Sequence, residues 1–599
     1  MKDPQSQDEA RSRAAVEGRV AFGAAALFLA GALVVVIDRV GAPARLVTGL
    51  APAIVMGGLV VLGFLAQAMR ISQFYAAGRL MPQKYVGLAV AGLAVALIPP
   101  MLPPGPFGPF GPPGALHAAL LAGLFLGVMV AGGFCGPMLR KSGAFSLPDL
   151  VGMRFDSSAV RAASAVAVAA SCGLVALAGF DGAIRSMQEA LGLAAAPAAV
   201  LVGFLVFCVV APGGLAGSAW GAAICAFVLA LALILPLAIL VGAGSPLPTP
   251  YLGHTDLWAE ALARAALWHP PTALSTLQFA ATVAAVALGV AAMAPLLSPI
   301  IASRRPHSTG RAGVVASIWL VLLVAAMAIS VAISALALDA LIVGQRADAL
   351  PPFLYVASDK GLVTICGQAV ASPRAAALLC GGAENYSGRM GLENIWASGR
   401  FLLMGLPELG RFSLAVSGLV NAGYLAIALA LAAAGIQTCA TALSHDLVFA
   451  TRQGLALASR RLAAARCIMV ALTLGLVYLA STAAHAPQQL LTLAILLCAA
   501  IVAPLLLLSA WSRATASDAA LAMGAGACAV VITIALAWRD GGFEMQIIAN
   551  GALGGFVAAA TLGFASSLRR KESETRAGRI FVEGLLHGDG EVTGADRSA

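Results

Sequence analysis

The feature that most constrains this chain is a series of apolar runs that recurs along the whole sequence. A bilayer core about 30 Å thick is crossed by about 20 helical residues, because each residue rises about 1.5 Å. About fourteen runs are long enough by this rule. They lie near residues 20–37, 46–68, 85–103, 116–139, 160–184, 194–211, 218–243, 276–299, 311–338, 410–443, 461–482, 487–511, 518–539 and 543–566. We therefore expect an all-α integral membrane protein with about fourteen transmembrane helices.

Composition excludes a soluble enzyme. The 599 residues are 60% hydrophobic and 11% charged, whereas soluble domains are about 45–50% apolar and about 25% charged. The 10 Cys are scattered without a C-x-x-C pair, so neither a zinc site nor a disulfide scaffold is indicated. No nucleophile–base set or phosphate-binding loop is visible either. We expect no enzymatic activity, no metal, no organic cofactor and no nucleic-acid partner; lipid and a small solute are the expected partners, and a small membrane subunit is left open.

Basic residues in short loops predict the orientation. Lys and Arg oppose translocation of short loops, and here they concentrate on the side of the N-terminus, in the loops near residues 70–84, 140–154, 304–311 and 452–466 and in the tail at 569–571. We therefore expect both termini to be cytoplasmic in a cell inner (plasma) membrane. The chain divides into an N-terminal cytoplasmic segment (1–19), a transmembrane transporter domain (20–566) and a cytoplasmic polar tail (567–599).

Two alternatives concern the chain's outer parts. The first apolar run could be a secretory signal cleaved near Ala42, but it is longer than the 7–15 residues of such signals and a polar segment precedes it, which favours a retained helix. The predicted outer stretch of roughly 340–409 holds Cys366 and Cys380. They could pair in an oxidising compartment or stay reduced.

Interrupted apolar runs are the first places to look for a transport path, because broken membrane helices occur where protein or a watery cavity covers them. The third span is interrupted by Pro99 and Pro100, and the eighth carries Pro295. The alternative is that helices simply end at these prolines. For the eighth span that alternative is the one we favour.

Ionisable and polar groups inside spans are the candidates for binding. Asp181 is the acidic residue that lies well within a span, and Arg185 follows one turn later, so a structural salt bridge competes with a functional role. The tenth span carries Gln437, Thr438 and Thr441, with Asn421 about four turns earlier. Such side chains bind a solute or join neighbouring helices.

Four local strings resemble the sodium:solute symporter family. They are SQFYAAGR at 72–79, SLPDLVGMRF at 146–155, GGLAGSAW at 213–220 and ALSHD at 442–446. The last is similar to the end of the eighth core helix in the acetate and monocarboxylate permease branch. The resemblance implies a leucine-transporter-like core of two inverted five-helix repeats, here about 85–511. It also implies alternating access around a site between the broken third and eighth spans.

The chain departs from that family where sodium would bind. The family's sodium site uses a pair of Ser/Thr hydroxyls, and the matching positions here are Ala430 and Leu431. Sodium prefers oxygen ligands, which these side chains lack. Sodium coupling at the usual site is therefore in question, and a proton at Asp181 is the alternative.

Two hypotheses result from these features. The first is a symporter-like secondary transporter for acetate or another monocarboxylate, coupled to sodium or protons, with Asp181, Asn421, Gln437, Thr438 and Thr441 as candidate contacts. The second is a transport-inactive relative that acts as a membrane scaffold, partner subunit or solute sensor.

Overall fold

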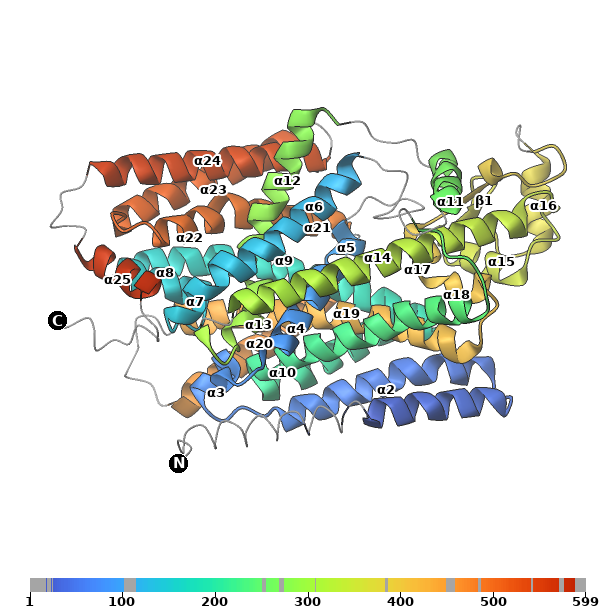
Figure 1. Ribbon diagram of the computed structural model, residues 1–599, viewed down its shortest axis with the longest axis horizontal. Coiled ribbons are helices and arrows are strands. Elements are labelled where there is room, and N and C mark those ends of the chain that lie inside the picture. The colour runs from blue at the N-terminus through green and yellow to red at the C-terminus, as the bar shows by residue number, and fades with distance from the viewer. Residues whose placement is uncertain are drawn as a thin grey trace.

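The computed structural model is a bundle of long helices, most of them aligned with its long axis (Figure 1). It describes residues 18, 23, 25–101, 115–249, 255–268, 274–306, 309–382, 386–448, 458–482, 486–539, 542–569 and 576–587. The predicted N-terminal segment 1–19 lies almost wholly outside these residues. A helix extends from residue 25 to residue 39, and α2 (Ala44–Leu65) is the next element along the chain.

The predicted first repeat begins at the third span. Its elements are α3 (Ile71–Ala76), η1 (Ala77–Arg79), α4 (Gln83–Ala96), α5 (Ile98–Met101), α6 (Ala115–Val130), η3 (Ala131–Cys135), α7 (Gly136–Lys141), α8 (Leu147–Phe155), α9 (Ser158–Leu191) and α10 (Ala195–Gly242). Helix α10 is interrupted at Gly214, whose φ of 54° and ψ of −139° are not helical. Its 48 residues would extend about 70 Å if straight, so this kink lets α10 supply two spans.

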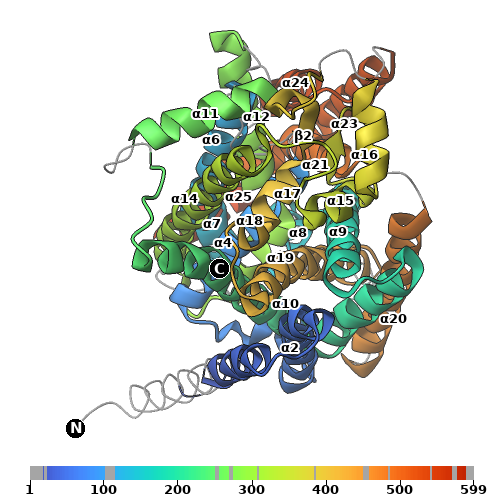
Figure 2. The ribbon, with the colours of Figure 1, turned by 90° about the vertical axis from the view of Figure 1, so that its right-hand side faces the viewer.

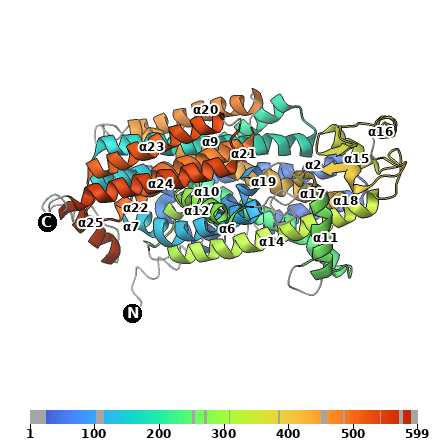
Figure 3. The same cartoon turned by 90° about the horizontal axis from the view of Figure 1, so that it is seen from above.

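The second predicted repeat follows α11 (Thr255–Trp268). Its elements are α12 (Thr276–Ala291), α13 (Ala294–Ile301), α14 (Thr309–Ile342), α19 (Leu414–Thr441), η6 (Ala442–Val448), α20 (Ala458–Thr482), α21 (Pro487–Leu497), η7 (Cys498–Val502) and α22 (Ala503–Ser509). Two flanking helices, α23 (Ala516–Arg539) and α24 (Met545–Leu568), pack against each other on one side of the bundle (Figure 3).

The helices match the expectation of a multi-pass membrane protein. Within the described residues, 10 helices are long and apolar enough to cross a membrane, or 11 with the bent pair α12–α13 counted as one span. Large apolar side chains also face outward, as they would toward lipid: Leu65 is 81% exposed, Val200 72% and Trp538 82%. The total of about fourteen spans stays a prediction.

The third and eighth spans are both interrupted. Helix α4 ends at Ala96, and the short α5 resumes at Ile98 and contains Pro99, which is exposed, and Pro100. In the eighth span, α12 and α13 meet at an angle of 44°. Pro295 lies in the first turn of α13, a position where the missing N–H of proline costs no helical hydrogen bond. The eighth span is therefore bent within the bundle, and its proline starts the second segment.

The basic loops gather at one end of the molecule, which we call the α8 end (Figures 1 and 3). Arg79 Nη2 donates to the Gly143 carbonyl at 2.6 Å, and Arg140 Nε donates to the Ser303 carbonyl at 2.9 Å. Arg466 donates to the carbonyls of Ala68 and Ala211. The basic loops that the sequence assigned to one side of the membrane thus share one end of the structure.

The tail contributes one further element at the α8 end. Helix α25 (Arg576–His587) packs against α8, and Phe581 lies 5.9 Å from the Arg154 guanidinium. Arg154 also donates to the carbonyls of Ser509 and Trp511. The polar composition of residues 567–599 predicts a disordered tail, and that prediction is wrong for residues 576–587, which form this helix.

The opposite end carries a small folded cap between α14 and α19 (Figure 2). Its elements are α15 (Pro352–Asp359), β1 (Val363–Ile365), α16 (Pro373–Gly381), η5 (Leu392–Asn394), β2 (Ile395–Ala397), α17 (Gly399–Met404) and α18 (Leu406–Leu409). Strands β1 and β2 pair antiparallel with Thr364 opposite Trp396. This two-stranded sheet is a small exception to the expected all-helical fold.

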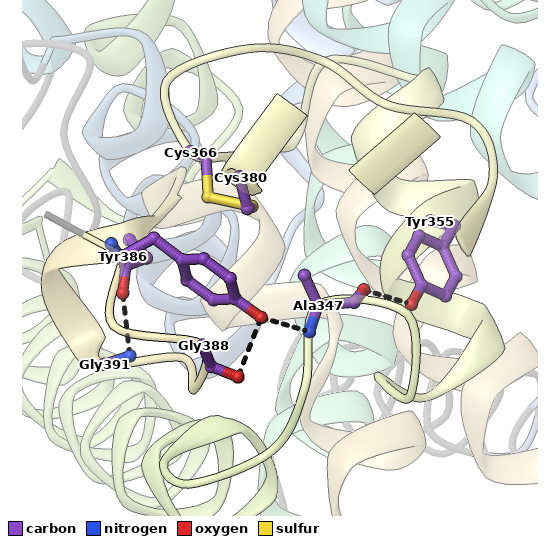
Figure 4. The surroundings of a disulfide bond; sticks show 8 residues. Ala347, Tyr355, Cys366, Cys380, Tyr386, Gly388 and Gly391 are labelled. Atoms are coloured by element: carbon purple, nitrogen blue, oxygen red, sulfur yellow. Dashed lines mark hydrogen bonds between the residues drawn. A yellow bond between two sulfur atoms is a disulfide. The ribbon is translucent and has the colours of Figure 1, made fainter. Parts of the chain in front are cut away.

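A disulfide joins Cys366 to Cys380 within the cap, with a Cα–Cα distance of 5.4 Å (Figure 4). Two tyrosines fix the neighbouring turn: Tyr355 Oη donates to the Ala347 carbonyl at 2.7 Å, and Tyr386 Oη accepts from the Ala347 N–H at 3.2 Å. The question that the sequence left open is thus answered in favour of pairing. A disulfide is typical of an oxidising compartment, which agrees with an outer position for the cap.

Small residues allow α9 and α19 to pack closely at the centre. A Cβ added at Gly435 would lie 2.7 Å from Ala176 Cβ, and one added at Gly179 would lie 2.5 Å from the Ala432 nitrogen. Membrane helices associate through such small residues because lipid provides no hydrophobic driving force between helices. This contact fixes the position of α19, whose inward face carries the candidate polar residues.

Candidate functional site

A cavity lies between α19 and the second half of the broken eighth span. It encloses about 390 Å³ of empty space, counted with its opening. Its walls come from α3, α7, α8, α9, α10, α13 and α19: Tyr75, Leu139, Phe145, Ser146, Leu147, Pro148, Val168, Leu215, Ala294, Leu297, Ser298, Ile301, Gln437, Thr438, Thr441 and Ala442. None of these described lining residues carries a formal charge, so the cavity suits a small solute of mixed polarity.

Three of the five candidate binding residues meet in this cavity. Gln437, Thr438 and Thr441 are all buried on α19. Thr438 Oγ1 donates to the Ala434 carbonyl at 2.8 Å, and Thr441 Oγ1 donates to the Gln437 carbonyl at 2.8 Å. Both hydroxyl protons are therefore used within the helix, which leaves oxygen lone pairs for a ligand.

Gln437 offers the cavity an acceptor that the protein does not satisfy. Its Nε2 donates at 3.4 Å to the Phe74 carbonyl and at 3.4 Å to Thr441 Oγ1. Its Oε1 is buried without a hydrogen-bond partner. A buried amide oxygen left unpaired costs free energy, so this atom is suited to a ligand or a water that donates a hydrogen bond.

The A-G-R part of the SQFYAAGR string explains how α3 presents Tyr75 to the cavity. Ala77, Gly78 and Arg79 have φ values of 52°, 61° and 56°, so three consecutive residues adopt the left-handed conformation. Only glycine adopts it without strain. The turn directs the chain from α3 into α4, and Arg79 is held by the Gly143 carbonyl.

The broken eighth span contributes the start of α13 to the opposite wall. Ala294 and Ser298 line the cavity, and Ser298 Oγ donates to the Pro295 carbonyl at 2.9 Å. Because the first N–H groups of a helix lack intrahelical acceptors and carry a partial positive charge, such a terminus favours an anionic group. Pro295 has no N–H, and the N–H groups of Leu296 and Leu297 donate to the Met293 carbonyl. This end of α13 therefore offers an anion its partial positive charge and at most one amide, that of Ala294.

The other two candidates lie elsewhere. Asp181 on α9 forms the salt bridge with Arg185, at 3.0 Å, and Arg185 is half exposed. Asn421 is partly exposed and lies sixteen residues before Gln437 on α19, about 24 Å along the helix. Neither residue lines the cavity.

The positions that match the family's sodium site are apolar in three dimensions as well. Ala430 and Leu431 are 5% and 1% exposed. Ala430 lines a second cavity of about 290 Å³ together with Leu59, Leu205 and Cys225. These hydrocarbon side chains provide no oxygen ligand for a cation.

A buried charged cluster lies beside the cavity at the α8 end. It consists of Asp149 on α8, Arg161 on α9, and His445 and Asp446 on η6, with exposures of 6%, 7%, 5% and 0%. Arg161 Nη2 lies 2.9 Å from Asp149 Oδ1 and 2.9 Å from Asp446 Oδ1. In the sequence, SLPDLVGMRF and ALSHD stand out only as strings that resemble the family, and no local pattern marks Arg161 as a partner of either one.

The local charges set the protonation of Asp149. Burial alone would raise the pKa of its carboxyl, but His445, Arg161 and the Phe145 N–H outweigh burial and hold the pKa below its usual range. Asp149, His445 and Asp446 could each offer a ligand atom to a metal ion. The Arg161 guanidinium already lies against both carboxylates, so a metal at that position would face its charge at short range.

Comparison with known proteins finds a family resemblance over part of the chain. Residues 74–349, a little under half of the sequence, match the sodium:solute symporter family. The match begins within α3 and ends just before α15. It includes most of the first string and all of the second and third strings that suggested the family. The match does not separate the acetate and monocarboxylate branch from the rest of the family.

A solved structure shows the fold of the core. A Na⁺-coupled sialic acid symporter in a substrate-bound, outward-open state aligns with a TM-score of 0.60 at 12% identity, covering 86% of this chain and 96% of that one. At that identity the likeness shows the fold, a leucine-transporter-like arrangement. No curated protein matches the sequence.

Two further structures align less closely. A nucleobase-cation-symport-1 family transporter with bound bromovinylhydantoin gives a TM-score of 0.45 at 11% identity and covers 86% of this chain and 97% of that one. A manganese transporter from Eremococcus coleocola gives 0.35 at 13% identity and covers 88% and 92%.

Proposed function

We propose that this chain is a secondary active transporter that moves a small organic solute by alternating access. The observation that carries the proposal is the unpaired Oε1 of Gln437 in a cavity between α19 and the bent eighth span. Binding sites of inverted-repeat transporters lie at such interruptions, where backbone amides and polar side chains meet the solute. The match of residues 74–349 to the sodium:solute symporter family supports the same function.

A monocarboxylate such as acetate is the solute class we propose. The partial positive charge at the start of α13 favours the carboxylate, and the lining is otherwise apolar enough for a short carbon chain. An ionised carboxylate only accepts hydrogen bonds. A water, or the O–H of the protonated acid, would therefore satisfy Gln437 Oε1.

The proposed setting is a cell inner membrane, with the α8 end and both termini in the cytoplasm. The basic residues at that end and the disulfide-bonded cap at the other support this orientation. The coupling ion is sodium or a proton.

A transport-inactive scaffold or sensor is the second candidate. The apolar pair Ala430 and Leu431 favours it, because a relative without ion coupling has no need of the hydroxyls at these positions. An ordinary carrier that couples to another ion explains the same pair.

Solute-protected alkylation distinguishes a transport cavity from a sealed core. Thr438→Cys would be placed in a Cys467→Ser, Cys528→Ser background, because both native thiols are exposed. We expect maleimide to block acetate counterflow in this variant, and we expect acetate to slow the reaction. Thr482→Cys, at the exposed end of α20, serves as the control and should react equally with or without acetate. Alkylation of Thr438→Cys at a rate that acetate does not change would contradict the proposed site.

A further inference from the structure

The charged cluster of Asp149, Arg161, His445 and Asp446 has a composition that favours proton binding. One guanidinium nitrogen, Nη2 of Arg161, contacts both carboxylates. Two buried carboxylates that share a cation repel each other, and a proton on one of them relieves both the repulsion and the cost of burying charge. Asp446 is the more deeply buried of the two, at 0% exposed.

The histidine in the cluster lies between Arg461 and Asp149. Arg461 Nη2 lies 3.1 Å from His445 Nδ1. Because arginine only donates, Nδ1 accepts and the ring proton resides on Nε2. This Nε2 is buried without a hydrogen-bond partner and lies 3.6 Å from Asp149 Oδ2. His445 therefore faces Asp149 through Nε2 at a distance longer than a hydrogen bond.

Two side chains connect this cluster to the cavity. Ser146 lines the cavity, and its hydroxyl donates to Asp446 Oδ2 at 2.6 Å. Tyr75 also lines the cavity, stacks on the His445 ring at 5.0 Å, and lies with its Oη 3.1 Å from Ser444 Oγ. A movement of Ser146 or Tyr75 in the cavity therefore changes the contacts of residues 444–446 directly.

We propose that Asp446 is the binding site of the coupling proton, which reaches it from the cavity through Ser146. The inference rests on the proposed transport function. In the transfer, Ser146 Oγ takes a proton from a water or acid in the cavity while its own hydroxyl proton passes to Asp446 Oδ2. The reverse transfer returns the proton, so Ser146 is unchanged after each cycle.

Every described element around Asp446 contributes a group to this site. Asp149 comes from α8, Arg161 from α9, His445 from η6 and Arg461 from α20. Tyr75 comes from α3. Protonation of Asp446 leaves Arg161 paired with Asp149, so the charges of these three residues sum to zero in the protonated state and to −1 in the deprotonated state.

The proton bound at Asp446 takes the role of the sodium ion, because the chain lacks side-chain oxygens at the usual sodium position. Ala430 and Leu431 offer no oxygen, and Asp181 is bound by the half-exposed Arg185 outside the cavity. Asp446 combines a carboxylate, complete burial and a hydrogen-bonded path to the cavity.

The test compares proton-driven accumulation with solute counterflow in proteoliposomes that contain the full chain. We expect Asp446→Asn, which stays uncharged, to retain acetate counterflow but to lose accumulation driven by a proton gradient, down to the level seen without a gradient. A matched control is Asp518→Asn, a fully buried aspartate outside the cluster, which should keep both activities. Accumulation that persists in Asp446→Asn would overturn the proposal, and so would its loss in Asp181→Asn alone.

A second variant covers the case in which Asp446→Asn fails to fold. Ser146→Ala removes the relay hydroxyl and leaves all charges in place, so we expect slower proton-driven uptake, by about tenfold or more, with counterflow retained. Unchanged proton-driven uptake in Ser146→Ala would overturn the relay. Absence of counterflow in the native protein would contradict the proposed function itself. That result differs from a variant that keeps proton-driven uptake, which would contradict only the proton site.

Discussion

The side-chain amide of Gln437 donates a hydrogen bond to the backbone carbonyl of Phe74, 363 residues earlier in the chain. It joins α19, in the second repeat, to the segment that leads into the first broken span. Gln437 therefore links the two repeats at the cavity in which we propose that the solute binds.

Removal of the Gln437 amide should weaken solute binding. Gln437→Ala removes the Oε1 acceptor that a bridging water, or the O–H of the protonated acid, would use, and a typical hydrogen bond contributes about 0.5–1.5 kcal/mol. We expect the KM for uptake to rise roughly threefold to tenfold. Gln489→Ala is the matched control because Gln489 is exposed at the start of α21. An unchanged KM in Gln437→Ala would place the solute elsewhere.

The close packing of α9 on α19 predicts a strong effect of adding one methyl group. In Gly435→Ala the new Cβ would meet the Ala176 backbone at 2.8 Å, and overpacking of this kind costs about 1–3 kcal/mol. We expect a lower melting temperature in detergent by scanning fluorimetry. Gly475→Ala, where nothing lies within 4 Å, should leave it unchanged or slightly raised. Equal melting temperatures for the two variants would show that α9 and α19 pack less tightly than described.

Much of this arrangement can be read from the sequence. Apolar run length located the spans, and the prolines drew attention to the interrupted third and eighth spans. The spacing of Gln437 and Thr441 placed both on one helix face, and both line the cavity. These features depend on local periodicity, which a sequence displays directly.

Contacts between distant segments could not be predicted in this way. The pairing of Arg161 with Asp446 joins residues 285 positions apart, and the pairing of Ser146 with Asp446 joins residues 300 apart. Asp181 was conspicuous because it lies within an apolar run, yet its partner is the neighbouring Arg185. The residues of the cluster lie near helix ends, where charge is ordinary in sequence and its burial appears only in the fold.

The disulfide of the cap should stabilise the outer end. Closing a loop of about 15 residues contributes about 3 kcal/mol in the chain-entropy account, and the sequence separation here is 14. We expect Cys366→Ser with Cys380→Ser to lower the melting temperature. In the native protein, maleimide should modify Cys366 and Cys380 only after reduction, whereas the exposed Cys467 should react without it. Modification of Cys366 without reductant would contradict the pairing.

The depressed pKa of Asp149 predicts a stability difference that disappears in acid. A carboxyl whose folded pKa lies below its ordinary value of 3.8 contributes stability that is complete above that value and is lost as the pH falls through the folded pKa. The melting temperature of Asp149→Asn should therefore lie below that of the native protein by a constant amount above about pH 5, and the gap should shrink below about pH 4. The exposed Asp359→Asn is the control. If the difference in melting temperature between Asp149→Asn and the native protein grew on acidification, the inferred direction of the Asp149 pKa shift would be wrong.

The most direct test of transport is uptake of labelled acetate and pyruvate into proteoliposomes under an inward proton gradient, an inward sodium gradient, or neither. The account predicts uptake that the proton gradient drives well above the other two conditions, because Asp446 is connected to the cavity and the sodium positions are apolar. Sodium-driven uptake would show that a cation binds away from Ala430 and Leu431. The absence of uptake under every gradient, with correctly inserted protein, would contradict the transporter account and favour the scaffold or sensor.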